Sequence, residues 1–194
     1  MSHNLYNLIP KRHGHVVFES GHHGDTWLDL ELLCRRPGLI RPHVERLADE
    51  LRQLEFDIIC GPLVEGAFVG LMVAEVLDVE FIYTTPQPTA TGNELFPTAY
   101  HIPDVVRPML KGRRVAIVND VINAGSSVKG TLDELRSVGA APVAIATLMT
   151  LGRSAEQIAS QWGIPLLELS HNEIGIWAPE ECPLCRDGIA VTSC

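Results

Sequence analysis

The stretch VAIVNDVINAGSS, Val115 to Ser127, decides the fold of this chain. An apolar run ends in Asn119 and Asp120, and after two more apolar positions a short turn of small residues follows. A strand that runs into such a turn and then into a helix presents backbone N–H groups to an anion. The stretch therefore predicts a phosphate cradle, although it carries one carboxylate where a sugar-diol or metal site is expected to use two. The alternative is an ordinary strand–turn–helix whose serines cap the helix.

The composition indicates a single globular domain, residues 1–194, with a net charge of −9. The 15 basic and 24 acidic residues argue against nucleic-acid and membrane-surface roles, which usually need a basic face. No run approaches the ~18 apolar residues of a membrane span, and the N-terminal sequence lacks the apolar core of a signal peptide. With an odd number of cysteines, five, these features predict a cytoplasmic protein.

Strand and helix patterns alternate along the chain, which predicts an α/β fold with a doubly wound, mainly parallel central sheet and helices on both faces. Predicted strands cover residues 15–21, 26–31, 57–60, 80–84, 114–118, 143–150 and 165–169. Predicted helices cover residues 42–54, 66–77, 127–138 and 154–162, with Ser126 or Ser127 capping the third and a Ser154–Gln157 capping box opening the fourth. Ligands of such sheets bind beyond the carboxyl ends of the strands. We therefore expect the loops at 61–66, 119–127 and 152–153 to converge.

The opening stretch resembles the phosphoribosyl-diphosphate motif of the type I phosphoribosyltransferases, in which two acids end the strand and a small-residue loop follows. Asn119 departs from that motif, because the family usually has an acid there. The resemblance implies that Asp120 and Asn119 form the catalytic pair, bind Mg²⁺ and hold the ribose hydroxyls through Asp120. The implied 5′-phosphate loop consists of Asn123, Ala124, Gly125, Ser126 and Ser127. Strand geometry adds that Asn119 and Asp120 point to opposite faces.

The first forty residues resemble the entry segment of the orotate phosphoribosyltransferases. The resemblance rests on Gly14-His15, Ser20-Gly21, Trp27, Asp29 and Pro37. It implies a small N-terminal hood at 1–40 that helps to hold the base and the pyrophosphate. Trp27 is the candidate for stacking on the base, and the alternative is a buried anchor.

Two further loops are similar to loops of the family. The first corresponds to its pyrophosphate loop and consists here of Gly61, Pro62, Leu63, Val64, Glu65 and Gly66. Glu65 stands where some relatives carry a lysine, and its carboxylate suits a bound Mg²⁺. The second, LMTLGR at 148–153, implies that Arg153 binds the carboxylate of orotate. The alternative for Arg153 is a surface arginine at a helix start.

Residues 85–108 contain five prolines and form the predicted lid loop. In the orotate enzymes the lid carries a lysine that reaches the active site of a neighbouring subunit. From residue 85 to the strand predicted at 114–118, no lysine precedes Lys111 and no arginine precedes Arg107, so His101 and Arg107 are the lid candidates. His22 and His23 occupy a turn where the family often has a cation. The site is therefore expected to be poor in positive charge.

An irregular tail is predicted at 177–194, and its CPLC sequence is the last unusual feature. Cys182 and Cys185 supply two of the four ligands of a structural zinc site. Cys194 or His171 could add one each, or two copies of the chain could complete a site together. The alternative is a reduced pair without metal.

The sequence leaves two functions open. The first is a homodimeric, Mg²⁺-dependent enzyme of pyrimidine nucleotide biosynthesis that resembles orotate phosphoribosyltransferase. It would transfer ribose-5-phosphate from phosphoribosyl diphosphate to orotate or a related pyrimidine base and release pyrophosphate. The second is a module of the same fold that binds a nucleotide or phosphoribosyl diphosphate without turnover. Its support is the cation-poor lid together with Asn119.

Overall fold

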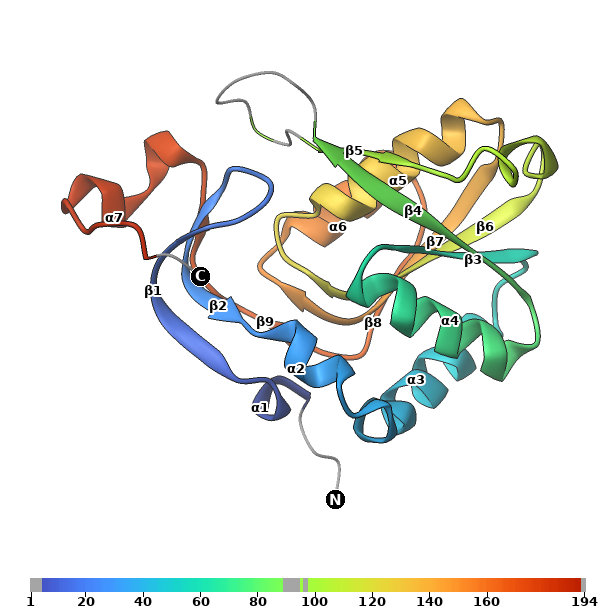
Figure 1. Cartoon of the computed structure of the whole chain (residues 1–194), viewed down its shortest axis with the longest axis horizontal. Coiled ribbons are helices and arrows are strands. Elements are labelled where there is room, and N and C mark those ends of the chain that lie inside the picture. Colours follow the sequence, from blue (N-terminus) through green and yellow to red (C-terminus); the bar gives the residue numbers. More distant parts are fainter. Residues whose placement is uncertain (1–4, 89–94, 96–97, 193–194) are drawn as a thin grey trace.

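The computed structural model describes residues 5–88, 95 and 98–192, and within them a large central sheet lies beside a smaller one (Figure 1). The central sheet has the order β5-β4-β3-β6-β7-β8, and β9 also pairs with β7. Its strands are β3 (Ile58–Pro62), β4 (Glu80–Pro88), β5 (Thr98–His101), β6 (Arg114–Ile122), β7 (Ala141–Leu151), β8 (Leu166–Glu168) and β9 (His171–Asn172). Only β4 and β5 pair antiparallel, which confirms the predicted mainly parallel sheet.

Helices cover both faces of the central sheet. The longer ones are α3 (Pro37–Leu51), α4 (Glu65–Leu77), α5 (Ser126–Ser137) and α6 (Ser154–Trp162). Along β6, Ala116 and Val118 pack in the core under α3 and α4, whereas Val115 and Ile117 pack in the core under α5 and α6. Because both of its faces are buried, β6 is a continuous apolar run before Asn119. The predicted doubly wound fold is confirmed.

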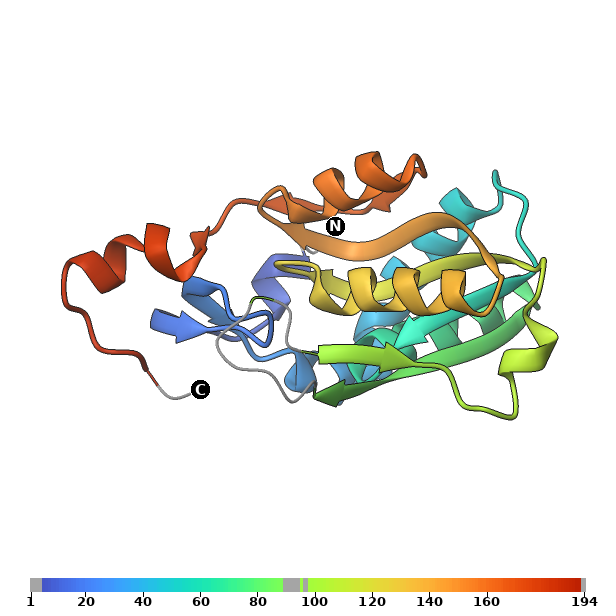
Figure 2. The same ribbon diagram turned by 90° about the horizontal axis from the view of Figure 1, so that it is seen from above.

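The smaller sheet brings the two ends of the chain together. It has the order β1-β2-β10, from β1 (Lys11–Val17), β2 (His23–Leu28) and β10 (Ile176–Trp177), and short helices α1 (Leu5–Leu8) and α2 (Leu30–Cys34) adjoin it in sequence. The backbone N–H of Gly175 donates to Asp25 Oδ1 at 3.2 Å. Figures 1 and 2 show the tail, with η2 (Pro179–Glu181) and α7 (Pro183–Arg186), lying beside β1 and β2. The segment from Gly175 onward therefore packs with the hood, and the tail predicted to be irregular contains two short helical turns, η2 and α7, between stretches without regular structure.

Several predicted strand boundaries shift in the structure. The strand predicted at 26–31 lies at 23–28 instead, because α2 begins at Leu30. The strand predicted at 57–60 continues through Gly61 and Pro62 in the structure, because β3 pairs with β4 as far as Pro62. The pairing of β3 with β6 ends at Cys60, so the missing N–H of Pro62 interrupts no hydrogen bond of the sheet.

The predicted lid is partly a β-hairpin, because β4 continues to Pro88 and β5 returns beside it. The 3₁₀ turn η1 (Arg107–Met109) follows, and residues 89–94 and 96–97 lie outside the described part. Among the described residues, no helix combines the length and apolar character needed to cross a membrane.

The predicted serine caps are wrong. Gly125 is the N-cap of α5 with φ 83°, Arg153 is the N-cap of α6, and neither helix has a side-chain cap bond. A Cβ at Gly125 would lie 2.3 Å from Ile158 Cδ1, so glycine is required there both by space and by its left-handed conformation. Ser126 and Ser127 are thus inside the helix, where their hydroxyl groups do not cap it.

Candidate active site

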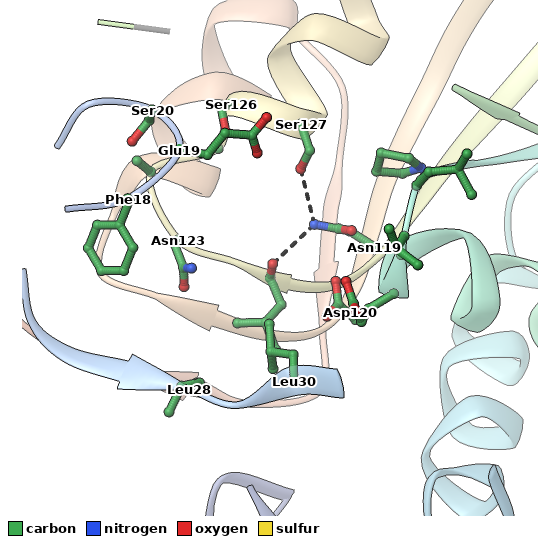
Figure 3. Close-up of a pocket in the computed structure, with 18 of the residues that line it drawn as sticks. Phe18, Glu19, Ser20, Leu28, Leu30, Asn119, Asp120, Asn123, Ser126 and Ser127 are labelled. Carbon is green, nitrogen blue, oxygen red and sulfur yellow. Dashed lines mark hydrogen bonds between the residues drawn. The ribbon is translucent and has the colours of Figure 1, made fainter. Parts of the chain in front are cut away.

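The main candidate site is a cavity at the carboxyl ends of β3 and β6 (Figure 3). The chain passes from β3 to β4 on one side and from β6 to β7 on the other, so this is the switch point of the sheet. The loop at 62–66, the end of β6 and the turn at 123–127 line the cavity, as do residues of the hood. Two of the three loops predicted to converge do so. The cavity volume is about 230 Å³, so a ligand that carries both a phosphosugar and a base must extend beyond it.

Asp120 is buried at the end of β6, and its carboxylate is only partly satisfied. Burial, with a smaller contribution from Glu65, raises the pKa of Asp120 to about 7, although backbone N–H groups of Asp120 and Val121 oppose the rise. Thr147 Oγ1 donates to the backbone carbonyl of Asp120 at 2.9 Å and fixes the strand there. Among the described residues, Asp120 Oδ2 has no hydrogen-bond partner. It is a buried acceptor that a ligand hydroxyl or a cation can satisfy.

Asn119 connects the strand to the phosphate loop. Its Nδ2 donates to the carbonyl of Val121 at 3.1 Å and to Ser127 Oγ at 3.4 Å (Figure 3). A Cβ at Gly66 would lie 2.1 Å from Asn119 Oδ1, so the glycine lets the loop after β3 approach this side chain. Asn119 and Asp120 both line the cavity, although neighbouring side chains of a strand point to opposite faces. The cavity lies over the tip of the strand, and side chains from both faces reach it.

The turn at 123–127 has the features of an anion site. Because α5 begins at Ser126 without a side-chain cap, its first N–H groups remain available, and the helix dipole favours negative charge there. Ser126 and Ser127 both line the cavity. Asn123 Oδ1 is buried without a hydrogen-bond partner in the described residues. The geometry therefore fits the predicted phosphate cradle.

The hood supplies Trp27, a predicted site residue, to the cavity, together with Phe18 and Glu19, which the sequence did not single out. The rings of Phe18 and Trp27 stack with centroids 6.1 Å apart and an interplanar angle of 15°, and both line the cavity. Tyr100 of β5 donates its hydroxyl to Glu19 at 3.2 Å, which joins the lid strand to the hood. The position of Phe18 and Glu19 directly before the Ser20-Gly21 turn was an available signal. Nothing in the sequence pattern indicated Tyr100.

The cavity is acidic. Carboxylates of Glu19, Glu31, Glu65 and Asp120 line it, and within the described part of the chain neither lysine nor arginine does. This agrees with the expectation of a site poor in positive charge.

Comparison with known proteins shows the family of this chain. A family model described as phosphoribosyl transferase domain matches residues 38–179. The chain belongs to the phosphoribosyltransferase family. The orotate phosphoribosyltransferase of Heliobacterium modesticaldum is 30% identical over 182 residues, which are 90% of this chain and 85% of the relative. That of Caldanaerobacter subterraneus subsp. tengcongensis is 27% identical over 180 residues, with coverages of 91% and 85%.

Solved phosphoribosyltransferases share the fold. Orotate phosphoribosyltransferase from Aeropyrum pernix has a TM-score of 0.63 at 21% identity and covers 83% of this chain and 87% of its own. Adenine phosphoribosyltransferase from Trypanosoma brucei, in complex with AMP, pyrophosphate and ribose-5-phosphate, has a TM-score of 0.64 at 17% identity, with coverages of 93% and 85%. These likenesses confirm the type I phosphoribosyltransferase fold.

Arg153 does not join the cavity of this phosphoribosyltransferase. It lines a separate pocket with Glu156, Glu168 and His171. The third loop therefore does not converge with the other two, because β7 ends beside β9 and not beside β3. The role of Arg153 in base binding stays a prediction.

The lid candidates also point elsewhere. Arg107 forms an ion pair with the buried Glu134 of α5, and His101 Nδ1 lies 3.9 Å from the same carboxylate. The N–H of Ile102 donates to Glu134 Oε1 at 3.0 Å. A buried carboxylate needs such partners. Arg107 and His101 therefore hold the lid against α5, and neither lines the cavity.

His22 and His23, in the turn of the hood, do not line the cavity either. His22 Nδ1 lies 3.1 Å from Ser20 Oγ, and burial lowers the pKa of His22, which favours the neutral ring at pH 7. His23 contacts His15 and Cys185. Positive charge must therefore come from outside the described lining of the cavity.

Proposed function

We propose that this chain is an orotate phosphoribosyltransferase. It transfers ribose-5-phosphate from phosphoribosyl diphosphate to orotate or a closely related pyrimidine base and releases pyrophosphate. The observation that carries the proposal is the similarity to orotate phosphoribosyltransferases over about nine-tenths of the chain. The hood is the part that faces the proposed base position, because Phe18 and Trp27 line the cavity.

The proposed roles follow from the geometry around the end of β6. The N-terminus of α5, with the hydroxyls of Ser126 and Ser127, holds the 5′-phosphate. Asp120 accepts hydrogen bonds from the ribose hydroxyls through the oxygen that lacks a protein partner. Asn119 keeps the strand and the phosphate loop at a fixed separation. Together they place the anomeric carbon between the loop at 62–66 and the hood.

The two reacting groups then lie on opposite sides of the sugar. A base nitrogen supplies the electron pair of the new bond to the anomeric carbon and gives up its proton to water. The bond between that carbon and the pyrophosphate oxygen breaks, and its electrons stay on the oxygen. Backbone groups of the loop at 61–66 hold the pyrophosphate, since Gly66 permits close approach. The stacked rings of Phe18 and Trp27 provide an apolar surface for the base.

Mg²⁺ fits the oxygen donors that the site offers. Asp120 Oδ2 and Asn123 Oδ1 are buried without hydrogen-bond partners in the described residues, and Glu65 lines the same cavity. Carboxylate and amide oxygens are the ligands that Mg²⁺ prefers. When bound with phosphoribosyl diphosphate, the ion would neutralise phosphate charge that this acidic cavity otherwise repels.

We also propose a homodimer. Val64, Phe68 and Leu71 form an exposed apolar row along α4, with Tyr83 of β4 also exposed. Val64 belongs to the loop that lines the cavity. A second copy on this face would lie beside the site, where a cation from its chain could compensate the acidic lining.

A second candidate function is a module that binds nucleotide without turnover. The observation that favours it is the acidic cavity, which presents four carboxylates and, among described residues, neither lysine nor arginine to the proposed leaving group. Loss of one charge-stabilising contact costs ~3–4 kcal/mol of transition-state stabilisation.

The test is an orotate-consumption assay. Protein, phosphoribosyl diphosphate and Mg²⁺ are mixed with orotate, uracil or adenine, and base absorbance and pyrophosphate release are followed. We expect turnover with orotate, matched by equimolar pyrophosphate, and a loss of about 10²-fold or more in Asp120→Asn. Turnover with adenine in place of orotate would contradict the proposed base. No turnover with any base, together with tight binding of a ribose-5-phosphate nucleotide, would establish the binding module instead.

A further inference from the structure

Four metal-binding side chains from the two ends of the chain meet beside the hood. They are His15 of β1, His23 of β2, and Cys182 and Cys185 around the start of α7. One ligand atom from each lies within 4.8 Å of all the others. His15 and Cys182 are buried, whereas Cys185 is exposed, so the cluster lies at the edge of the molecule with access from solvent.

The separations within the cluster fit one small tetrahedral ion. His15 Nε2 lies 3.6 Å from the Sγ atoms of both Cys182 and Cys185. His23 Nδ1 lies 3.1 Å from Cys185 Sγ and 2.8 Å from His15 Nε2. Zinc bonds of about 2.3 Å to sulfur and about 2.0–2.1 Å to nitrogen give tetrahedral edges of ~3.3–3.8 Å. Two edges match, and the two shorter ones need an opening of about half an ångström each.

The groups behind the cluster orient its ligands. His15 Nδ1 lies 2.6 Å from the carbonyl oxygen of Ile189, which can only accept, so Nδ1 carries the proton and Nε2 keeps its lone pair for a metal. The N–H of Arg186 donates to the carbonyl of Cys182 at 3.2 Å, and this turn brings the two thiols to one side. Both arrangements are typical of metal sites.

We propose that His15, His23, Cys182 and Cys185 bind one Zn²⁺ in a structural site. This proposal is independent of the reaction. It corrects the sequence-based search for further ligands, since His171 contacts Thr150 and Glu173 instead, and Cys194 lies outside the described residues. The signal was missed because 167 positions separate His15 from Cys182, and only the fold brings them together.

The site has a defined structural consequence. His15 and His23 stand on either side of the turn that carries Phe18, Glu19 and Ser20 into the cavity. The ion would fix both ends of this turn and attach the tail to them. A ring closed over so long a stretch of chain restricts the unfolded state, so metal and stability are coupled.

The decisive experiment measures metal on the full chain. The protein is purified with reductant, loaded with excess ZnCl₂, freed of unbound metal and analysed for zinc and free thiols. We expect about one Zn²⁺ per chain, and an affinity at least ~100-fold weaker in Cys185→Ser and in His23→Gln. His171→Gln and Cys34→Ser are matched controls that remove the same ligand types outside the cluster, and both should keep the zinc.

A second measurement does not depend on whether the variants fold. In wild-type protein, Co²⁺ in place of Zn²⁺ should give the intense visible bands of a tetrahedral ion and a thiolate charge-transfer band. Chelation should lower the melting temperature of wild type and leave a folded Cys185→Ser unchanged. Less than about 0.1 zinc per chain after loading, an octahedral cobalt spectrum, or a Cys182–Cys185 disulfide in reductant-treated protein would overturn the proposal.

Discussion

At the residue scale, Asn119 makes contacts that an acid cannot make. Its amide nitrogen donates to the Val121 carbonyl and to Ser127 Oγ, and its oxygen faces Gly66. A carboxylate offers only acceptors, and it would stand against a carbonyl oxygen. Asp120 and Glu65 already place negative charge in the same cavity. The departure from the family motif therefore has a structural reason in this chain.

Restoring the acid with Asn119→Asp is expected to destabilise the protein. The variant loses two donated hydrogen bonds and adds a fifth carboxylate to the four that line the cavity, for a cost of about 1–3 kcal/mol. Urea unfolding at pH 8 measures the difference. Gln53→Glu, which adds the same charge at an exposed position, is the control and should stay within about 0.5 kcal/mol of wild type. An Asn119→Asp protein as stable as wild type at pH 8 would refute the structural role.

The raised pKa of Asp120 predicts that the free energy of unfolding falls as pH rises from about 4 to 7. Its pKa is about 7 in the folded chain, against ~3.9 in an unfolded one. The folded state therefore holds the proton more tightly, so the contribution is present below pH ~4 and is lost as pH rises towards 7. The Asp120→Asn variant lacks this titrating group. The difference between its free energy of unfolding and that of wild type should therefore shift in favour of the variant by on the order of 3 kcal/mol between pH 4 and pH 8. Urea unfolding of both proteins at several pH values is the measurement, and a difference independent of pH would contradict the raised pKa.

At the scale of elements, local patterns fixed the helices better than the strand ends. Residues 154–162 were predicted as a helix with the bounds that α6 has. The start of α3 was missed, because Pro42 suggested a first turn, whereas the helix begins at Pro37 and contains Pro42. The serine caps were wrong because Gly125 takes the N-cap position of α5, where a Cβ would meet Ile158 of α6. This contact is between residues far apart in the sequence. The spacing of apolar residues shows which face of a helix or strand is buried, but it does not show which residues of other elements pack against that face.

The same limit explains which parts of the site were found. The loops after β3 and β6 were predictable, because each follows an apolar strand of a parallel sheet. The lid candidates His101 and Arg107 lie against α5 and not in the cavity, because Glu134 is buried and pairs with Arg107, which the sequence does not show. Their role in the reaction stays a prediction. The cluster at His15 was beyond reach, since it depends on a tail that returns to the hood. The site residues that depend on contacts between distant segments of the chain could be found only from the structure.

At the scale of the whole molecule, the acidic cavity and the exposed apolar row along α4 lie beside each other, so a partner that covers the row would also lie beside the cavity. Phosphoribosyl diphosphate is strongly anionic, and the described lining of the cavity offers it backbone N–H groups and carboxylates. Val64, Phe68 and Leu71 lie at helical spacing on one exposed strip. Apolar strips of this kind are typical of interaction surfaces. A dimer formed there would cover the strip and bring a second chain to the loop that precedes α4.

The paired change Phe68→Glu with Leu71→Glu is expected to separate the proposed dimer. Two charges in an apolar interface lose burial and gain repulsion across a twofold axis, so dissociation should become at least ~100-fold more favourable. Sedimentation velocity over a concentration series measures the mass, and the orotate assay on the same samples tests whether activity falls with it. Val105→Glu is the control, because Val105 is 81% exposed and lies beyond β5, away from α4. A wild-type chain that is monomeric while active would show that each site works with the charges of its own chain, and a dimer that survives the paired change would show that the interface lies on another face.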